Sequence, residues 1–251
     1  MFGVVLLSQL VGMGLTLVIA IVRSEPIPSG PDLLLCVLAG ALGGTGITAL
    51  YRGLAVGRMG IVAPITGVLA AVIPVAAGFL LEGLPSTLVL VGIGLAIVAV
   101  VLVSRVADED GGRAGLVEAL IAGTAIGLFG VVIAQISEGF VFSSLTVIRG
   151  VQAVLVGLVV VVTRAAWRLD RRIVPLVVAV GVLDMIGNAC YLLGVQAGAL
   201  AIASVLSSLY PVTTVILAAV LLRERVTRHH VVGIGLAAAA IACIGFGSTI
   251  P

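Results

Sequence analysis

The chain has 251 residues, of which 61% are apolar and only 10% are charged, and its formal net charge at pH 7 is +2. A soluble protein of this length cannot bury so much apolar surface in one core, so the composition excludes an ordinary soluble domain. A bilayer solvates apolar outer faces, and a helix of about 20 apolar residues crosses its hydrocarbon layer. The composition therefore predicts an all-α integral membrane protein.

Apolar runs of suitable length follow one another along the chain, separated by connections too short to hold a soluble domain. They predict nine transmembrane helices: Phe2–Val22, Leu33–Ala55, Gly60–Leu81, Thr87–Ser104, Ala114–Ile136, Phe140–Thr163, Ile173–Gln196, Leu200–Leu222 and His230–Gly247.

Arginines are distributed unevenly between the two ends of these runs. On one side only Arg23 is found. The connections and helix ends on the other side carry Arg52, Arg58, Arg105, Arg113, Arg164, Arg168, Arg171, Arg172, Arg223, Arg225 and Arg228. Basic residues accumulate on the cytoplasmic side of membrane proteins. The bias predicts a cytoplasmic Arg-rich end and places the C-terminus at Pro251 outside.

The hexapeptide VGIGLA occurs at Val91–Ala96 and again at Val232–Ala237. Tyr51 and Tyr191 are separated by nearly the same interval, as are Glu82 and Glu224. A fixed interval between similar segments indicates two copies of one structural unit, which is common in membrane transporters.

This offset of about 140 residues aligns Arg149 with Gln9 and Asp184 with Gly44. It aligns the fifth run with positions before the first residue. We therefore expect an incomplete first repeat of four helices over residues 1–105 and a second repeat of five helices over residues 113–249. The first helix of the first repeat is missing, through truncation, a start codon assigned too late, or a genuine nine-helix variant. Because the complete unit has five helices, successive copies should be inverted.

Several motifs resemble the EamA-type family of the drug/metabolite transporter superfamily. They are Tyr51-Arg-Gly-Leu-Ala-Val-Gly57, Val62-Ala-Pro64, Gly181-Val-Leu-Asp184, Ser207-Ser-Leu-Tyr-Pro211-Val-Thr213 and Leu222-Arg-Glu224-Arg. The resemblance covers nearly the whole chain. It implies a plan of ten helices in two inverted repeats, from which this chain departs by the missing first helix, and it implies an exporter of small metabolites.

Two charged residues, Arg149 and Asp184, fall near the middle of apolar runs, where ionisable groups are costly and usually face a cavity or a partner. They could pair, either at a substrate cavity or as a salt bridge that only fixes packing. Asp184, Asn188 and Tyr191 share one helix face, and Gln152 shares a face with Arg149.

These residues predict a polar pocket for a small zwitterionic or anionic metabolite, with Arg149 holding a carboxylate. Ser207 and Ser208 are candidates to add hydroxyl groups, although serines in membrane helices often serve packing alone. Asp184 is the candidate coupling group for protons, whereas strong pairing with Arg149 would favour exchange or facilitated diffusion.

The sequence thus predicts a secondary transporter that works by alternating access, an exporter of amino acids or related metabolites in the bacterial cytoplasmic membrane. The alternatives are multidrug efflux of lipophilic cations and a non-transporting scaffold or inactive fragment. Because the chain has no phosphate-binding glycine loop with its Lys and no nucleophile–base arrangement, we expect no ATP hydrolysis and no enzyme. We expect no cofactor, no metal and no nucleic acid. The expected partners are a small-molecule substrate and the lipid bilayer, and a second copy of the chain is a candidate partner in a homodimer.

Overall fold

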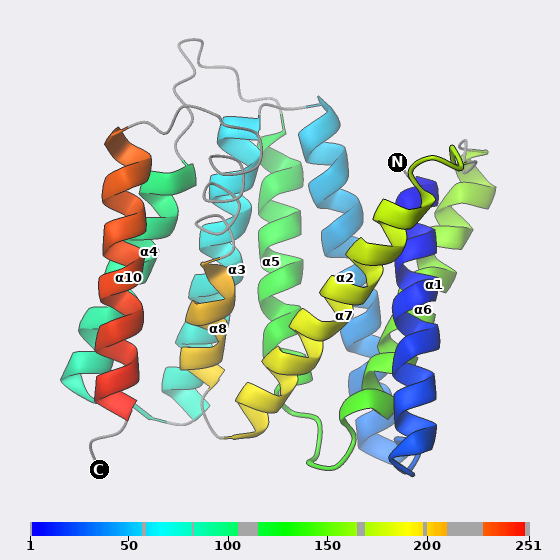
Figure 1. The fold of residues 1–251 in the computed structure, drawn as a ribbon, viewed down its shortest axis with the longest axis horizontal. Helices are drawn as coiled ribbons and strands as arrows, with labels where there is room; N and C mark the ends of the chain where they lie inside the picture. Colours follow the sequence, from blue (N-terminus) through cyan, green and yellow to red (C-terminus); the bar gives the residue numbers. More distant parts are fainter. Residues whose placement is uncertain are drawn as a thin grey trace.

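The computed structural model describes residues 2–56, 59–81, 83–104, 115–164, 169–197, 200–209 and 228–248. Within these ranges all regular structure is helical (Figure 1). The helices are α1 (Phe2–Val22), α2 (Gly30–Val56), α3 (Met59–Leu81), α4 (Thr87–Ser104), α5 (Leu116–Ile133), α6 (Val141–Thr163), α7 (Val174–Gln196), α8 (Leu200–Ser208) and α10 (Arg228–Ser248).

Five of these helices, α1, α2, α5, α6 and α7, are long and apolar enough to cross a membrane. Shorter apolar stretches lie in α3, α4 and α10, at Ile65–Leu81, Thr87–Ala99 and Val231–Ile244. The predicted run Leu200–Leu222 begins with α8, but its part after residue 209 lies outside the described residues. The all-helical fold is therefore confirmed, and the full set of nine spans stays a prediction.

The helices pack side by side in an elongated bundle (Figure 1). At one lateral edge of the bundle α4 packs against α10, and at the opposite lateral edge α1 packs against α6 and α7. Between them α5 packs against both α2 and α3, while α3 also contacts α8. Helices from both sequence halves therefore meet throughout the bundle.

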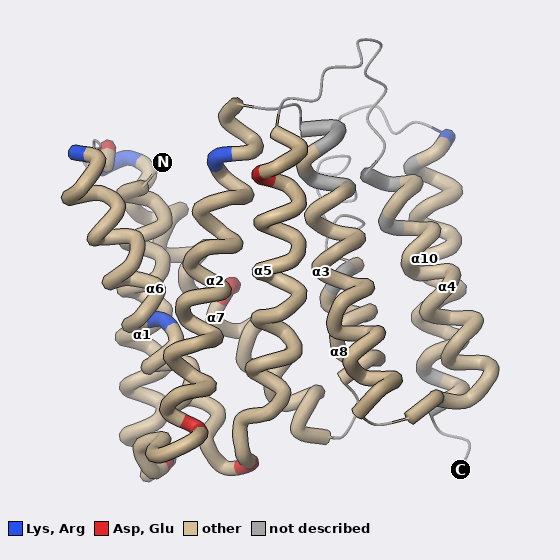
Figure 2. The backbone as a smooth tube through the Cα atoms, turned by 180° about the vertical axis from the view of Figure 1, so that it is seen from behind, with Lys and Arg blue, Asp and Glu red and all other residues tan. Residues whose placement is uncertain are grey.

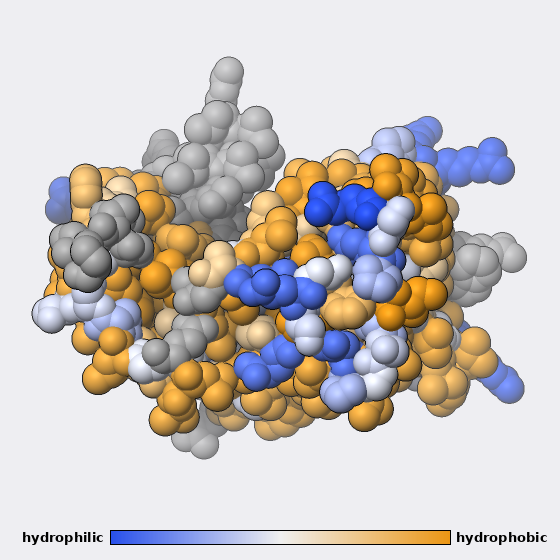
Figure 3. Space-filling model, turned by 90° about the horizontal axis from the view of Figure 1, so that it is seen from below, coloured by the Kyte–Doolittle hydropathy of each residue, from blue (hydrophilic) through white to orange (hydrophobic). Residues whose placement is uncertain are grey.

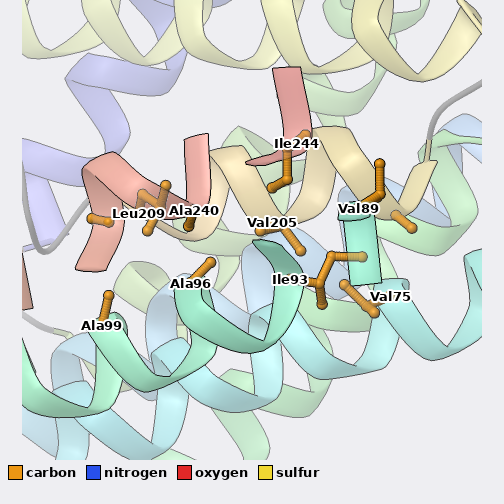
Figure 4. Close-up of a cluster of buried hydrophobic side chains, with 11 residues drawn as sticks. Val75, Val89, Ile93, Ala96, Ala99, Val205, Leu209, Ala240 and Ile244 are labelled. Atoms are coloured by element: carbon orange, nitrogen blue, oxygen red, sulfur yellow. The ribbon is translucent and has the colours of Figure 1, made fainter. Parts of the chain in front are cut away.

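Two clusters of buried apolar side chains hold these helices together. One cluster joins α3, α4, α8 and α10, where Val75, Ile93, Val205 and Ile244 are buried together (Figure 4). The other joins α2, α5, α6 and α7 and includes Leu145 and Leu192. The many exposed large apolar side chains outside these clusters suit a lipid environment.

Small residues let α2 lie close to its neighbours. A Cβ on Gly40 would come within 2.6 Å of Val151 in α6, and one on Gly46 within 2.7 Å of Ile126 in α5. Real Cβ atoms do not approach so closely, so both contacts require glycine.

Most charged residues lie near the two ends of the helices (Figure 2). At one end, Arg52 of α2 lies 3.6 Å from Glu118 of α5, and Arg164, Arg171 and Arg172 flank the α6–α7 connection. The predicted bias also uses residues outside the described ranges: Arg58, Arg105, Arg113, Arg168, Arg223 and Arg225. The assignment of this end to the cytoplasm stays a prediction.

The opposite end carries a hydrophilic patch surrounded by apolar side chains (Figure 3). Here the connection between α5 and α6 is tied to two other elements. The backbone N–H of Ser137 donates to Asp32 Oδ1 at 3.0 Å, and Gln196 Nε2 of α7 donates to the Ser137 carbonyl at 3.2 Å. These bonds fix the start of α6, the helix that carries Arg149.

Candidate functional site

The two intramembrane charges meet between α6 and α7. Arg149 is the ninth of the 23 residues of α6, and Asp184 is the eleventh of the 23 residues of α7, so both lie in the middle third of their helices. Arg149 Nη2 lies 2.8 Å from Asp184 Oδ2. This ion pair is the centre of the candidate site.

The ion pair is held rigidly on the Arg149 side. The side chain of Arg149 is 3% exposed, and Nη1 donates to Gln9 Oε1 of α1 at 2.9 Å. The guanidinium lies flat against Gly12, where an added Cβ would come within 2.9 Å of three of its atoms. Its Nε is buried and has no hydrogen-bond partner among the described residues. Helix α1 therefore forms a tight backing for the cation.

Asp184 has a different environment, because its side chain is 42% exposed. Its Oδ1 accepts a hydrogen bond from Asn188 Nδ2 at 3.2 Å, and the same amide donates to the Asp184 carbonyl at 2.8 Å. These two residues share one face of α7, as their spacing of four predicts. The pair thus combines a buried cation with an accessible carboxylate.

The accessible face of Asp184 opens into a cavity of about 410 Å³. Tyr191 lines this cavity, and its hydroxyl donates to the Gly130 carbonyl at 3.2 Å and shares a hydrogen bond of 3.0 Å with Ser204 Oγ. The lining comes from α3, α5, α7 and α8: Ala70, Pro74, Ile126, Phe129, Gly130, Asp184, Gly187, Asn188, Tyr191, Ser204 and Ser207. We call this the larger cavity.

A smaller cavity of about 230 Å³ adjoins it on the Arg149 side. Ile126, Phe129, Asp184 and Asn188 line both cavities, so the carboxylate stands at their junction. The remaining lining of the smaller cavity is Gln9, Gly43, Ile47, Leu145, Ile148, Arg149 and Gln152. A Cβ on Gly43 would overlap the Gln152 amide, so glycine is needed for this side chain to reach the cavity.

The structure brings together most of the residues that the sequence nominates. Arg149 and Gln152 line the smaller cavity, Tyr191 and Ser207 line the larger one, and Asp184 and Asn188 line both. The side chain of Ser208 lies outside the described part of the chain.

Sequence reasoning missed the residues that support this set. Gln9 has a signal, since the repeat offset makes it the counterpart of Arg149, but its hydrogen bond to Arg149 depends on the packing of α1 against α6. Gly43 lies in a glycine-rich stretch that is typical of close helix packing, and Phe129 has no distinguishing pattern in its apolar run. Within the described ranges, no three His, Cys, Asp or Glu side chains are placed to hold a metal ion.

A helical bundle with several membrane-crossing helices defines a multi-pass integral membrane protein. The model of the EamA-like transporter family matches residues 113–246, just over half of the chain. The chain therefore belongs to this family of the drug/metabolite transporter superfamily.

Comparison with solved structures supports the fold. Twenty-seven solved chains match. One, a crystal structure described only as that of a protein, superposes with a TM-score of 0.80 at 16% sequence identity and covers 98% of this chain and 87% of its own. At this identity the likeness shows a shared fold and nothing about substrate. No curated protein matches the chain.

Proposed function

We propose that this protein is a secondary transporter that moves small metabolites by alternating access and exports amino acids or related compounds. The observation that carries the proposal is the Arg149–Asp184 pair at the wall of a cavity of about 410 Å³, halfway along membrane helices. Ionisable groups at this depth are expensive and usually line substrate pathways. The family membership supports transport, whereas export and the bacterial cytoplasmic membrane follow only from the resemblance.

We also propose that residues 1–105 and 113–249 are inverted repeats, since their contacts recur with the halves exchanged. Gly40 of α2 packs on Val151 and the Ile148 carbonyl of α6, while Gly181 of α7 packs on Val11 and the Ser8 carbonyl of α1. In Figure 1, α1 runs opposite to α6, α2 opposite to α7, and α4 opposite to α10. Within the described residues α5 has no such counterpart.

Reconstitution into liposomes tests the transport proposal. Purified protein should catalyse counterflow of labelled neutral amino acids into vesicles that contain unlabelled substrate, without ATP. Protein-free vesicles are the control. Flux indistinguishable from protein-free vesicles for a broad metabolite mixture would favour the scaffold alternative.

Efflux of lipophilic cations is the second candidate, and one observation favours it. Asp184 exposes a carboxylate to a cavity that also contains the rings of Phe129 and Tyr191, and aromatic faces attract cations. Inhibition of amino-acid counterflow by tetraphenylphosphonium, together with uptake of the labelled cation, would support this candidate over metabolite transport.

Proton coupling through Asp184 is a separate question. Its ion pair with Arg149 gives this carboxylate a direct partner in the membrane interior, and exchange and facilitated diffusion are the alternatives to proton coupling. Transport by Asp184→Asn with an unchanged pH profile would rule out Asp184 as the proton carrier.

A further inference from the structure

We propose that the substrate is a zwitterion that inserts into the Arg149–Asp184 ion pair. Its carboxylate replaces Asp184 on the Arg149 guanidinium, and its ammonium group binds the released Asp184 carboxylate. This inference rests on the proposed transport function and names the substrate class and the binding step.

The two partners differ in their freedom to move. Arg149 is 3% exposed, is bonded to Gln9 and lies on Gly12, so the guanidinium stays in place. Asp184 is 42% exposed and stands at the junction of the two cavities. The pair therefore opens by a rotation of the Asp184 side chain toward the larger cavity.

A buried guanidinium without an anion is strongly unfavourable, so Asp184 leaves only when another anion takes its place. A substrate carboxylate can do so, because Arg149 also lines the smaller cavity. Its planar donors fit a carboxylate, and its Nε has no partner within the described residues. Ligand binding then replaces one ion pair by two.

Net charge selects against simpler ligands. The empty site holds one cation and one anion, so a zwitterion leaves the site neutral. A carboxylate without an amine leaves a net negative charge in the membrane interior, and an amine without a carboxylate leaves a net positive charge. Because a net charge is costly in this apolar setting, either fragment should bind more weakly than the zwitterion.

The larger cavity indicates what the rest of the substrate is. Among its described lining residues Asp184 is the one charged side chain, and Pro74, Phe129 and Ile126 are apolar. With the charged head at the junction, the substrate side chain points into this space. An uncharged apolar or aromatic side chain fits it, whereas a second charge would be left without a partner.

The experiment uses two matched ligand series on the full-length chain: leucine, 3-methylbutylamine and 4-methylpentanoate, and phenylalanine with its corresponding amine and acid. Counterflow in liposomes measures transport, and the ligand-induced rise of the thermal midpoint in detergent measures binding independently. Wild type should prefer the zwitterion about tenfold or more in at least one series. Equal recognition of the three members of both series overturns the proposal.

Variants assign the two ends of the ligand. Asp184→Asn should lose the zwitterion preference and favour the acid, because Arg149 is left without its anion, and Arg149→Gln should shift preference toward the amine. Because each single change leaves one charge of the pair without its partner, the double variant Arg149→Gln/Asp184→Asn removes both charges together, and it should recognise the three members of a series equally. Parallel loss of all three ligands in the folded single variants contradicts the insertion.

Controls separate this inference from the proposed function. Glu138→Gln and Arg228→Gln remove one exposed charge each outside the cavities and should behave as wild type. Zwitterion-selective thermal shifts without any flux would leave the binding inference intact and refute transport. Flux without zwitterion selectivity would leave transport intact and refute the insertion.

Discussion

Three glycines lie against three polar side chains of the candidate site. Gly12 faces Arg149, Gly43 faces Gln152, and Gly130 faces the hydroxyl of Tyr191. In each pair the glycine belongs to a neighbouring helix, and its missing Cβ leaves the space that the polar group occupies. The geometry of the site therefore depends on small residues as much as on the functional groups.

Gly130 offers a sharp test of this dependence. A Cβ there would lie 2.8 Å from Tyr191 Oη but 3.6 Å from Cζ, so the clash involves the hydroxyl alone. Gly130→Ala should lower the thermal midpoint by displacing Tyr191. Tyr191→Phe should cost about 1 kcal/mol through its lost hydrogen bonds, yet it should rescue Gly130→Ala.

Thermal unfolding of the purified single and double variants in detergent measures this coupling. The double variant should be more stable than the sum of the single changes predicts. Gly14→Ala is the control, because no atom lies within 4 Å of its added Cβ, and it should be neutral or slightly stabilising. Strict additivity at Gly130 and Tyr191 would contradict the clash.

The sequence identifies the polar residues of the site but not their partners. Arg149, Asp184 and Asn188 stand out because polar groups in apolar runs are rare, and helical spacing places Asp184 and Asn188 on one face. The bond from Arg149 to Gln9 crosses 140 residues, and no local pattern specifies such a contact. Phe129 and Pro74 join the site only through the packing of α5 and α3 around α7 and α8.

At the scale of elements, the start of α6 is stabilised from a distance. Phe140 at its N-cap provides no side-chain hydrogen bond. Glu25, in the α1–α2 connection, accepts hydrogen bonds from the N–H groups of Phe142 at 2.7 Å and Ser143 at 3.0 Å. Arg23 Nε lies 3.3 Å from the other oxygen of this carboxylate. A carboxylate at a helix N-terminus satisfies free N–H groups and complements the helix dipole.

Glu25→Ala should therefore destabilise the protein by about 1–2 kcal/mol. Its side chain is 8% exposed, so water replaces the lost acceptor poorly. Chemical denaturation followed by helical circular dichroism measures the loss. Glu138→Ala, which removes an exposed carboxylate from the neighbouring connection, should change stability little; an equal effect of both would show that Glu25 acts through charge alone.

At the element scale the sequence also predicts helix positions well, because long apolar runs leave no competing structure in a membrane. The boundaries of α1 and α4 coincide with the predicted runs. Helix α2 begins at Gly30 and ends at Val56, slightly beyond its run. This extension includes Asp32, whose bond to Ser137 is a tertiary contact that an apolar run does not encode.

For the whole molecule, the arginine distribution makes a prediction about orientation. Glu138 lies at the end with the α5–α6 connection, and Arg171 lies at the Arg-rich end. In a cysteine-free background, Glu138→Cys should react with a membrane-impermeant maleimide in intact cells, and Arg171→Cys should react only after permeabilisation. The reverse pattern would invert the orientation without changing the fold.

The exchanged glycine contacts of α2 on α6 and of α7 on α1 have a consequence for energetics. If the proposed inverted repeats are related by a pseudo-twofold axis, that axis passes close to the guanidinium, because Gln9 and Arg149, which the repeat offset makes counterparts, are hydrogen bonded. If the halves swap conformations during transport, a ligand on Arg149 stays near the pivot while access changes sides. Because the repeat offset places Gly44 at the position that corresponds to Asp184, the two proposed repeats differ in charge at this position. The cargo-free protein should then rest predominantly in one facing state.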